Sequence, residues 1–259
     1  MPSTLECARI RRVNATGRIP VVFIHGLWLL PMSWERWAQV FGEAGFASLS
    51  PAWPCAPPPT VRTADEVADH FAALIGGLER KPAVVGHSTG GLLAQILAGR
   101  GLACAAVAIG PALSQDVLSL PVSPPRVPTD PACPLTYDRF RHAFANAVGE
   151  EEALELYETF AAPGVPPYPA SAGAFGPWSE PEVDAVAKDR GPLLLISGEM
   201  DHIVPWAAAR AAYDKQVRNE HHLTEIIEMP GRGHSLTVDN GWREVCGTAL
   251  TFMQRFVDP

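Results

Sequence analysis

The sequence predicts an α/β fold with a mostly parallel central sheet and helices on both faces. Two observations lead to this expectation. Short apolar runs alternate along the chain with amphipathic helical patterns, as they do where helices join the strands of a parallel sheet. Several of these runs end in turns that contain glycine and polar residues, and open sheets of this class gather their functional side chains at such strand ends.

The expected elements follow one another in strand–helix order. Strands are predicted at residues 19–25, 46–51, 83–85, 104–110, 192–198 and 223–230. Helices are predicted at residues 33–45, 63–78, 91–99, 205–217 and 242–256. Ser33 is expected to cap the first of these helices, and Thr63 with Glu66 forms a capping-box pattern for the second.

Residues 113–186 interrupt this alternation. The segment holds 12 of the 26 prolines and has no convincing strand pattern. It carries two amphipathic helical patterns, at 135–148 and 150–161, the second with Leu154, Tyr157 and Phe160 on one face. We expect a helical lid inserted in the chain, with residues 1–112 and 187–259 forming the core, although a mobile linker is the alternative.

Composition excludes several classes of protein. The net charge is −8 and no dense block of lysine and arginine occurs, so a nucleic-acid partner is not expected. The five cysteines are scattered, which argues against a disulfide framework or a zinc site. No run approaches 18 apolar residues and no signal-peptide pattern precedes the first strand, so a cytoplasmic protein without a membrane span is expected.

Ser88 is the candidate nucleophile. It lies in Gly86-His-Ser-Thr-Gly90, between an apolar run and a helical pattern. A serine on a sharp strand-to-helix turn exposes its hydroxyl, and glycine two positions away on either side avoids a collision. The turn also brings the Thr89 N–H to a helix N-terminus, where an oxyanion can bind. An ordinary glycine-rich turn is the competing interpretation.

A serine needs a histidine base and an acid that orients it. Among eight histidines, His234 lies in a glycine-rich loop directly after the last predicted strand. The others are expected elsewhere: His87 should point away from its neighbour Ser88, and the remaining ones belong to strand ends, helices or surface loops. Asp201, which follows a strong apolar run and a turn, is the preferred acid. Its rivals are Glu199, Asp239 and Asp184.

A second oxyanion donor is expected after the first strand. In Phe23-Ile-His-Gly-Leu-Trp28, Gly26 leaves room for a ligand and the Leu27 N–H is the expected donor. A tight turn before the next helix is the alternative. The order serine, acid, histidine along the chain is that of one particular fold.

These motifs resemble the α/β-hydrolase superfamily. The matching stretches are VVFIHGLW, VVGHSTGGL, LLLISGEMDHIVP and GRGHSL, and the resemblance runs from about residue 19 to the C-terminus. It implies Ser88 as nucleophile, His234 as base, Asp201 as the acid that orients it, and Leu27 and Thr89 as oxyanion donors. GHSTGG is similar to esterases and to cofactor-free haloperoxidases, although Trp28-Leu-Leu stands where the latter usually carry proline.

The resemblance implies hydrolysis of an ester or lactone of a small, largely apolar molecule through an acyl-enzyme, with no metal or cofactor. Trp28, His25 and Trp206 are the expected substrate-binding residues, and Phe140, Phe144 and Trp178 are weaker candidates. A C–C bond hydrolase or a perhydrolase on the same triad is the first alternative. A ligand-binding receptor with the same fold is the second. A homodimer is left open.

Overall fold

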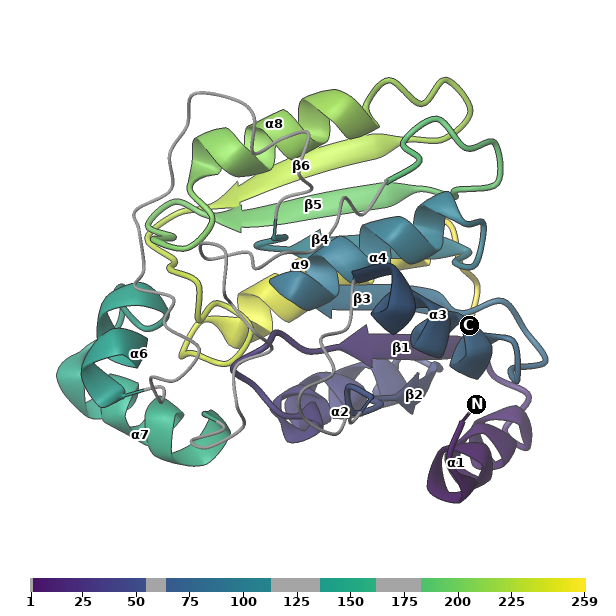
Figure 1. The fold of residues 1–259 in the computed structure, drawn as a ribbon, viewed down its shortest axis with the longest axis horizontal. Helices are drawn as coiled ribbons and strands as arrows, with labels where there is room; N and C mark the ends of the chain where they lie inside the picture. The colour runs from purple at the N-terminus through teal and green to yellow at the C-terminus, as the bar shows by residue number, and fades with distance from the viewer. Residues whose placement is uncertain (1, 55–63, 113–135, 162–182) are drawn as a thin grey trace.

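The computed structural model describes residues 2–54, 64–112, 136–161 and 183–259. Six parallel strands form one sheet in the order β2-β1-β3-β4-β5-β6 (Figure 1). The strands are β1 (Pro20–Ile24), β2 (Ala47–Leu49), β3 (Ala83–His87), β4 (Ala105–Ile109), β5 (Leu193–Gly198) and β6 (Thr224–Met229). The parallel sheet expected from the sequence is confirmed.

Helices cover both faces of the sheet. α3 (Ala64–Ile75), α4 (Thr89–Gly99) and α8 (Trp206–Gln216) lie on the face toward the viewer in Figure 1. α2 (Glu35–Glu43) and α9 (Trp242–Gln254) lie on the other face. α1 (Thr4–Asn14) packs near the β2 edge, beside α3.

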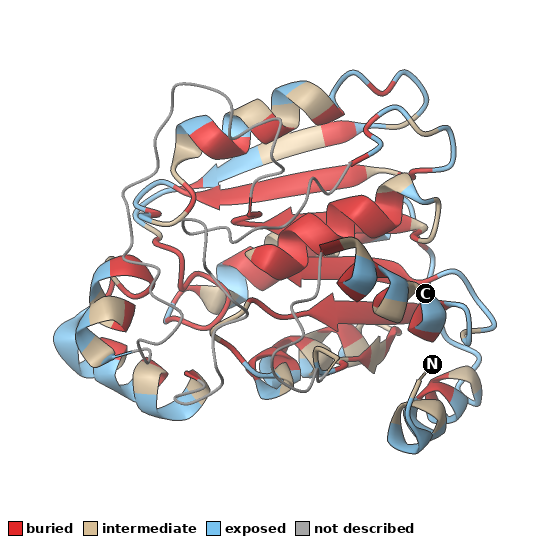
Figure 2. Ribbon diagram, viewed as in Figure 1, coloured by how far each residue is buried: buried red, intermediate tan, exposed pale blue. Residues whose placement is uncertain are grey.

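Alternation of side chains along each strand divides the core into two halves. Val22 and Ile24 of β1 join the cluster under α3 and α4, whereas Val21 and Phe23 join the cluster under α2 and α9. All five β1 residues are buried, and Figure 2 shows the central strands and α4 as the most deeply buried part of the molecule, whereas β6 at the edge is partly exposed. A strand covered on both faces needs apolar residues at every position, which explains the uninterrupted apolar runs in the sequence.

Two predictions about helix starts need correction. Residues 31–34 form a short 3₁₀ helix, η1 (Pro31–Trp34), and α2 begins only at Glu35. Ser33 does not cap the helix, because its hydroxyl donates to the carbonyl of Leu30 at 2.8 Å. The proline at the first position of η1 favours this tight turn. Thr63, the other expected cap, lies outside the described residues.

α1 was not predicted, yet its signal is local. Ser3 accepts a hydrogen bond from the Glu6 N–H, and Glu6 returns one to the Ser3 N–H, which completes a capping box. Only Ile10 and Val13 of the helix are buried, so its apolar face is narrow. A helix with so few apolar residues has no clear hydrophobic period. The spacing of Ser3 and Glu6 is the signal that would have predicted it.

Two helices of the expected lid segment are described, α6 (Tyr137–Ala143) and α7 (Glu150–Phe160). They lie beyond the carboxyl ends of the strands, at the left in Figure 1. Phe140 and Phe144 are buried in a cluster that also contains Leu29 and Val238 of the core. Leu154 was expected on the packed face but is 44% exposed, and Ala153 and Leu156 are buried instead. Trp178 lies outside the described residues.

The topology places a switch point of the sheet at the carboxyl ends of β1 and β3. From β1 the chain passes outward to β2, and then returns to β3 on the opposite side of β1. The loops that follow β1 and β3 therefore diverge, and open α/β sheets bind ligands at such a point. Gly26 follows β1 and Ser88 follows β3 at this position.

Among the described residues, none of the helices has the length and apolar character of a membrane span.

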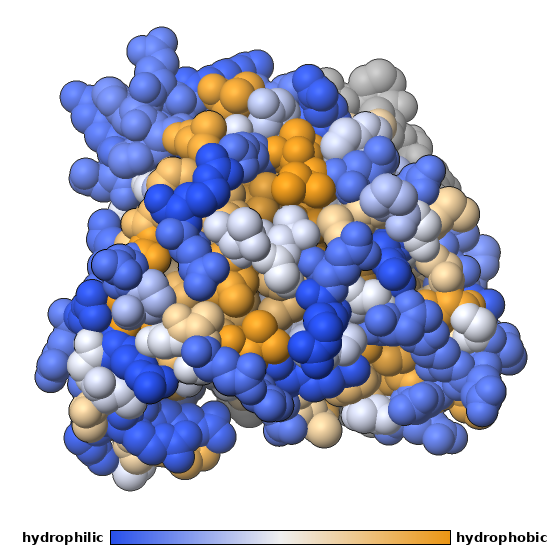
Figure 3. All heavy atoms as spheres, turned by 180° about the vertical axis from the view of Figure 1, so that it is seen from behind, coloured by the Kyte–Doolittle hydropathy of each residue, from blue (hydrophilic) through white to orange (hydrophobic). Residues whose placement is uncertain are grey.

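On the face seen in Figure 3, hydrophilic side chains predominate around the rim and apolar ones gather nearer the middle. Cys7, Cys104 and Cys246 are free thiols, and Cys55 and Cys133 lie outside the described residues.

Candidate active site

Ser88 occupies a strained turn between β3 and α4. Its φ is 57° and its ψ is −120°, and it is the one non-glycine residue with positive φ among the described residues. A residue other than glycine in such a sparsely populated backbone region costs about 1–3 kcal/mol, so surrounding structure must hold it in place. The Ser88 N–H donates to the Ile109 carbonyl at 2.8 Å, and its own carbonyl accepts from the Ala112 N–H at 2.9 Å.

The flanking glycines are required by close backbone contacts. A Cβ atom at Gly86 would lie 1.9 Å from the Gly90 carbonyl oxygen. A Cβ atom at Gly90 would lie 2.1 Å from the Ile24 carbonyl oxygen. Side chains at either position would therefore push α4 away from β3 and β1. The GxSxG pattern thus reflects the packing of the turn itself.

His234 and Asp201 form a buried pair. Nδ1 of His234 lies 2.7 Å from Oδ2 of Asp201, and the two residues are 1% and 4% exposed. The second oxygen, Oδ1, accepts from the N–H groups of Ile203 and Val204, each at 2.8 Å. Both carboxylate oxygens are therefore oriented. The carboxylate holds the imidazole with Nδ1 protonated and leaves Nε2 as the free basic nitrogen.

Gly110 brings this pair close to the end of β4. It follows the strand with φ +46°, and a Cβ atom there would lie 3.3 Å from Asp201 Oδ2 and from His234 Nδ1. Its N–H donates to the Ile196 carbonyl at 2.7 Å. Nε2 of His234 is shielded from solvent and has no hydrogen-bond partner within the described residues. This nitrogen is the atom expected to accept the proton of the nucleophile.

Gly26 lies directly against Ser88. A Cβ atom at Gly26 would be 3.1 Å from the Ser88 Cβ. Leu27, next along the chain, is half-buried, and Thr89 is the first residue of α4. The Thr89 N–H has no intrahelical acceptor, since the first turn of a helix leaves its N–H groups free. The two backbone segments expected to bind an oxyanion are therefore next to Ser88.

His25 lies buried beside Gly26. Its Nδ1 is 2.8 Å from the Gly26 carbonyl oxygen, and because a carbonyl only accepts, Nδ1 must carry the proton. The Gly26 carbonyl and the Leu27 N–H belong to one peptide group, so this bond orients the expected donor. Burial lowers the pKa of His25 to about 4, although the bond to Gly26 opposes the shift. His25 is therefore neutral at pH 7.

This shift makes stability depend on pH. The unfolded imidazole titrates near 6.5 and the folded one near 4, so the unfolded state binds more protons between these values. Stability is fully present above pH 6.5 and falls as the pH drops toward 4. The His25 contribution lost at pH 5 is about 2 kcal/mol.

Urea unfolding at pH 7 and pH 5 measures this loss. His25→Phe should reduce the difference between the two pH values by about 2 kcal/mol, whatever its stability at pH 7. Exposed His221, replaced in the same way, is the control and should leave the difference unchanged. An unchanged pH dependence in His25→Phe would contradict the burial of a neutral imidazole.

His87 was expected to point away from the serine, but it packs against the expected base. The centroids of the His87 and His234 rings are 4.7 Å apart. Nε2 of His87 lies 2.9 Å from the His234 carbonyl oxygen. His87 is the last residue of β3, and these two contacts join it to the loop that follows β6. The sequence carries no local signal for this contact.

Aromatic side chains surround the histidine. The Phe144 ring lies 5.6 Å from that of His234, and the Trp28 ring lies 6.4 Å from that of Phe144. Trp28 is half-buried next to Leu27. Trp206 begins α8 and is also half-buried, and within the described residues no ring contact joins it to the triad candidates.

The rival residues are engaged elsewhere. Glu199 is exposed and accepts from the Gly231 N–H at 2.8 Å. Asp239 accepts from the Ser235 hydroxyl at 3.0 Å and from the Gly241 N–H, and burial raises the pKa of its carboxyl. Asp184 accepts from the Val186 N–H.

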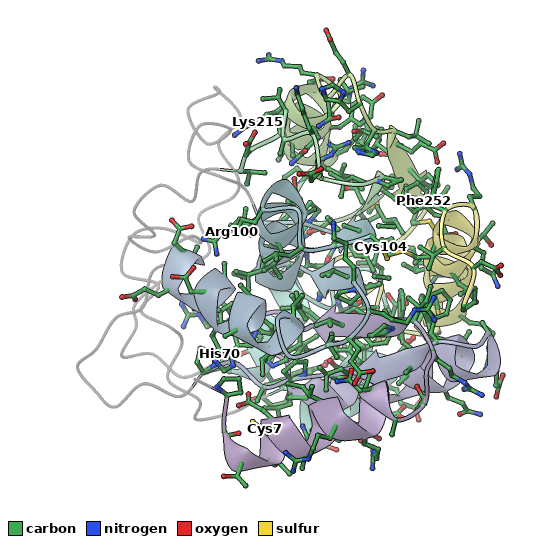
Figure 4. All side chains as sticks on the ribbon, turned by 90° about the vertical axis from the view of Figure 1, so that its right-hand side faces the viewer. Cys7, His70, Arg100, Cys104, Lys215 and Phe252 are labelled. Carbon is green, nitrogen blue, oxygen red and sulfur yellow. The ribbon has the colours of Figure 1, made fainter. Side chains whose placement is uncertain are left out.

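Of the other histidines, His70 lies between α3 and α1, where it faces Glu6 at 3.2 Å (Figure 4). His202 is exposed, and its Nδ1 lies 3.1 Å from the His142 carbonyl oxygen. No group of three or more metal-ligating side chains lies close together within the described ranges.

Comparison with known proteins decides the family. The model of the alpha/beta hydrolase family matches residues 21–248. The chain belongs to the alpha/beta hydrolase family. No curated protein matches it. The expected resemblance is thereby confirmed, and the strand ends that carry Ser88, Asp201 and His234 all lie inside the matched range.

Three solved structures show the extent of the fold likeness of this alpha/beta hydrolase. A meta-cleavage product hydrolase from Pseudomonas fluorescens has a TM-score of 0.68 at 18% identity, over 92% of this chain and 91% of the other. A monoacylglycerol lipase from Paleococcus ferrophilus has a TM-score of 0.67 at 19% identity, over 92% and 95%. A thermophilic esterase from Thermogutta terrifontis has a TM-score of 0.63 at 18% identity, over 92% and 90%.

Proposed function

We propose that the protein is a serine hydrolase that cleaves an ester or lactone through an acyl-enzyme on Ser88. The observation that carries the proposal is the strained turn at Ser88, φ 57°, held at the same strand ends as the buried His234–Asp201 pair. Strain of this kind persists where it exposes a nucleophile. Membership of a hydrolase family supports the same conclusion.

The proposed reaction has two acyl-transfer steps. The Ser88 hydroxyl oxygen attacks the substrate carbonyl carbon while Nε2 of His234 takes its proton. The resulting oxyanion accepts hydrogen bonds from the Leu27 and Thr89 N–H groups. The C–O bond to the leaving alcohol then breaks, and the alcohol takes the proton from Nε2. Water repeats the sequence on the acyl-enzyme and releases the acid.

Asp201 orients the base throughout. With Oδ1 held by two backbone N–H groups, Oδ2 keeps the His234 ring in one tautomer and stabilises the imidazolium that forms. We propose a small and largely apolar substrate, because the Phe144 ring lies against that of His234 and the Trp28 ring lies against that of Phe144. Trp28, His25 and Trp206 remain the proposed substrate-binding residues, and no metal or cofactor has a part in these steps.

A fluorophosphonate probe tests the proposal. The probe phosphonylates only serines that a neighbouring base activates. We expect a single adduct on Ser88, read by intact mass and peptide mapping, and none in Ser88→Ala. Ser235→Ala is the matched control, because that hydroxyl is buried and bonded to Asp239, and it should label like the wild type. An unlabelled wild-type protein would contradict the proposal and favour a receptor.

The same triad serves C–C bond hydrolysis, and one of the similar structures is a meta-cleavage product hydrolase. Its likeness to this chain is one of fold. A panel of aryl esters, lactones and vinylogous diketones, given to the purified protein, separates the two chemistries. If the protein turns over only the diketones, the proposed function becomes C–C bond hydrolysis, and Ser88 and His234 have related roles in it.

A further inference from the structure

His87 is buried at the centre of the candidate site, yet the proposed reaction does not use it. The side chain has no exposed surface, and it comes from β3, directly before Ser88. Its Nε2 lies 2.9 Å from the carbonyl oxygen of His234, a residue 147 positions away in the chain. Breaking this bond would leave two buried polar groups without a hydrogen bond, so the contact between these distant residues is costly to lose.

The bond to His234 defines the tautomer of His87. A carbonyl oxygen can only accept, so Nε2 of His87 carries the proton and Nδ1 is bare. Nδ1 is buried and has no hydrogen-bond partner within the described residues. Burial keeps the pKa of His87 well below its usual value, and the neighbouring His234 lowers it further. The imidazole is therefore neutral.

His87 lies against three of the backbone segments that form the candidate site. It precedes the nucleophile, its ring lies against the His234 ring, and a Cβ atom at Gly26 would lie 3.5 Å from its Nδ1. Phe144 covers the ring at a centroid distance of 6.0 Å. One rigid imidazole thus lies between the loop after β1 and the loop after β6.

We propose that His87 is a positioning residue that holds the backbone of the base His234 at a fixed distance from Ser88. Asp201 orients the imidazole of His234 from one side, through Nδ1, and His87 anchors the main chain of the same residue from the other. Because its ring and its backbone are both held, the Nε2 atom of His234 can point in one direction only. This inference rests on the proposed function, because it assigns His234 the role of base.

Two substitutions separate the hydrogen bond from the ring packing. His87→Gln keeps a donor near the position of Nε2, whereas His87→Phe keeps a ring of similar size without a donor. We expect His87→Phe to react with the fluorophosphonate about 10²-fold more slowly, since small misplacements of reacting groups cost that much. His87→Gln should recover about tenfold of this loss.

An ester that the wild type turns over gives the second readout. Because the ring has no exposed surface, His87 does not contact the substrate, and its loss should lower kcat with little change in KM. Ile75→Val, a buried change on α3 away from the site, controls for a general loss of stability. If His87 had a merely structural role, His87→Phe and His87→Gln would contain less active protein, but each active molecule would keep the kcat of the wild type.

Nitrogen NMR of the histidine rings tests the contact without any reaction. The His87 signals, assigned by their loss in His87→Gln, should show a neutral ring with the proton on Nε2 from pH 5 to pH 8. A proton on Nδ1, or titration within that range, would overturn the proposal. If the wild type reacts with the fluorophosphonate and His87→Phe reacts equally fast, the proposal is also overturned. An unreactive wild type would instead overturn the proposed function, and the NMR result would still decide the contact.

Discussion

Ser88→Ala is expected to lower kcat about 10⁴- to 10⁶-fold on any ester that the wild type hydrolyses. The loss is large because the attacking atom itself is removed, and the remaining rate comes only from binding and the oxyanion donors. KM should change little, since alanine leaves the backbone of α4 and β3 in place. Steady-state kinetics on an aryl ester provides the measurement.

The other triad members should not add to this loss. His234→Ala alone should cost about as much as Ser88→Ala, and the double variant should be no slower than either, because the two residues act in one step. Asp201→Asn should lose about 10⁴-fold, since an amide favours the wrong tautomer of His234. Glu199→Gln is the control acid, because Glu199 is exposed and bonded only to the Gly231 N–H. An additive double variant would show that Ser88 and His234 do not work together.

Arg190→Met is expected to lower the free energy of unfolding by about 3–5 kcal/mol. Arg190 is fully buried, and burial lowers the pKa of its guanidinium to about 10. It donates to the carbonyls of Gln216, His222 and Leu223 and to the Thr224 hydroxyl. These acceptors close the end of α8 onto the start of β6, and methionine would remove all the hydrogen bonds that Arg190 donates to them.

Within the part of the chain that the structure describes, Arg190 donates to no carboxylate. The partial negative charge at the carboxyl end of α8, where Gln216 is the last residue, stabilises it instead. Urea unfolding measures the loss, and Arg210→Met is the matched control because Arg210 is exposed, pairs with Asp214 and lies over the Tyr213 ring. The control should lose less than about 0.5 kcal/mol. An equal small loss in both variants would show that the Arg190 network contributes no more than a surface pair.

Corrections to the sequence analysis came from two kinds of interaction. Ser33 fails as a cap because Pro31 and the Leu30 carbonyl favour a 3₁₀ turn, a local competition that periodicity does not register. Leu154 was placed on the wrong side of α7 because the apolar spacing there fits two faces equally well. Packing of Ala153 and Leu156 against the core selects one of them.

By itself, the sequence determined the strand order along the chain, the sharp turn at Ser88 and the position of His234 after the last strand. These depend on short-range physics, namely the continuous apolar runs of strands that are covered on both faces and the collisions that only glycine avoids at positions 86 and 90. Only the tertiary structure decided that Asp201 rather than Glu199 faces His234, and that Nε2 of His87 contacts the carbonyl oxygen of the same histidine. Such contacts join residues 33 and 147 positions apart, and they exist only once the parallel strands have brought their carboxyl ends to one edge of the sheet.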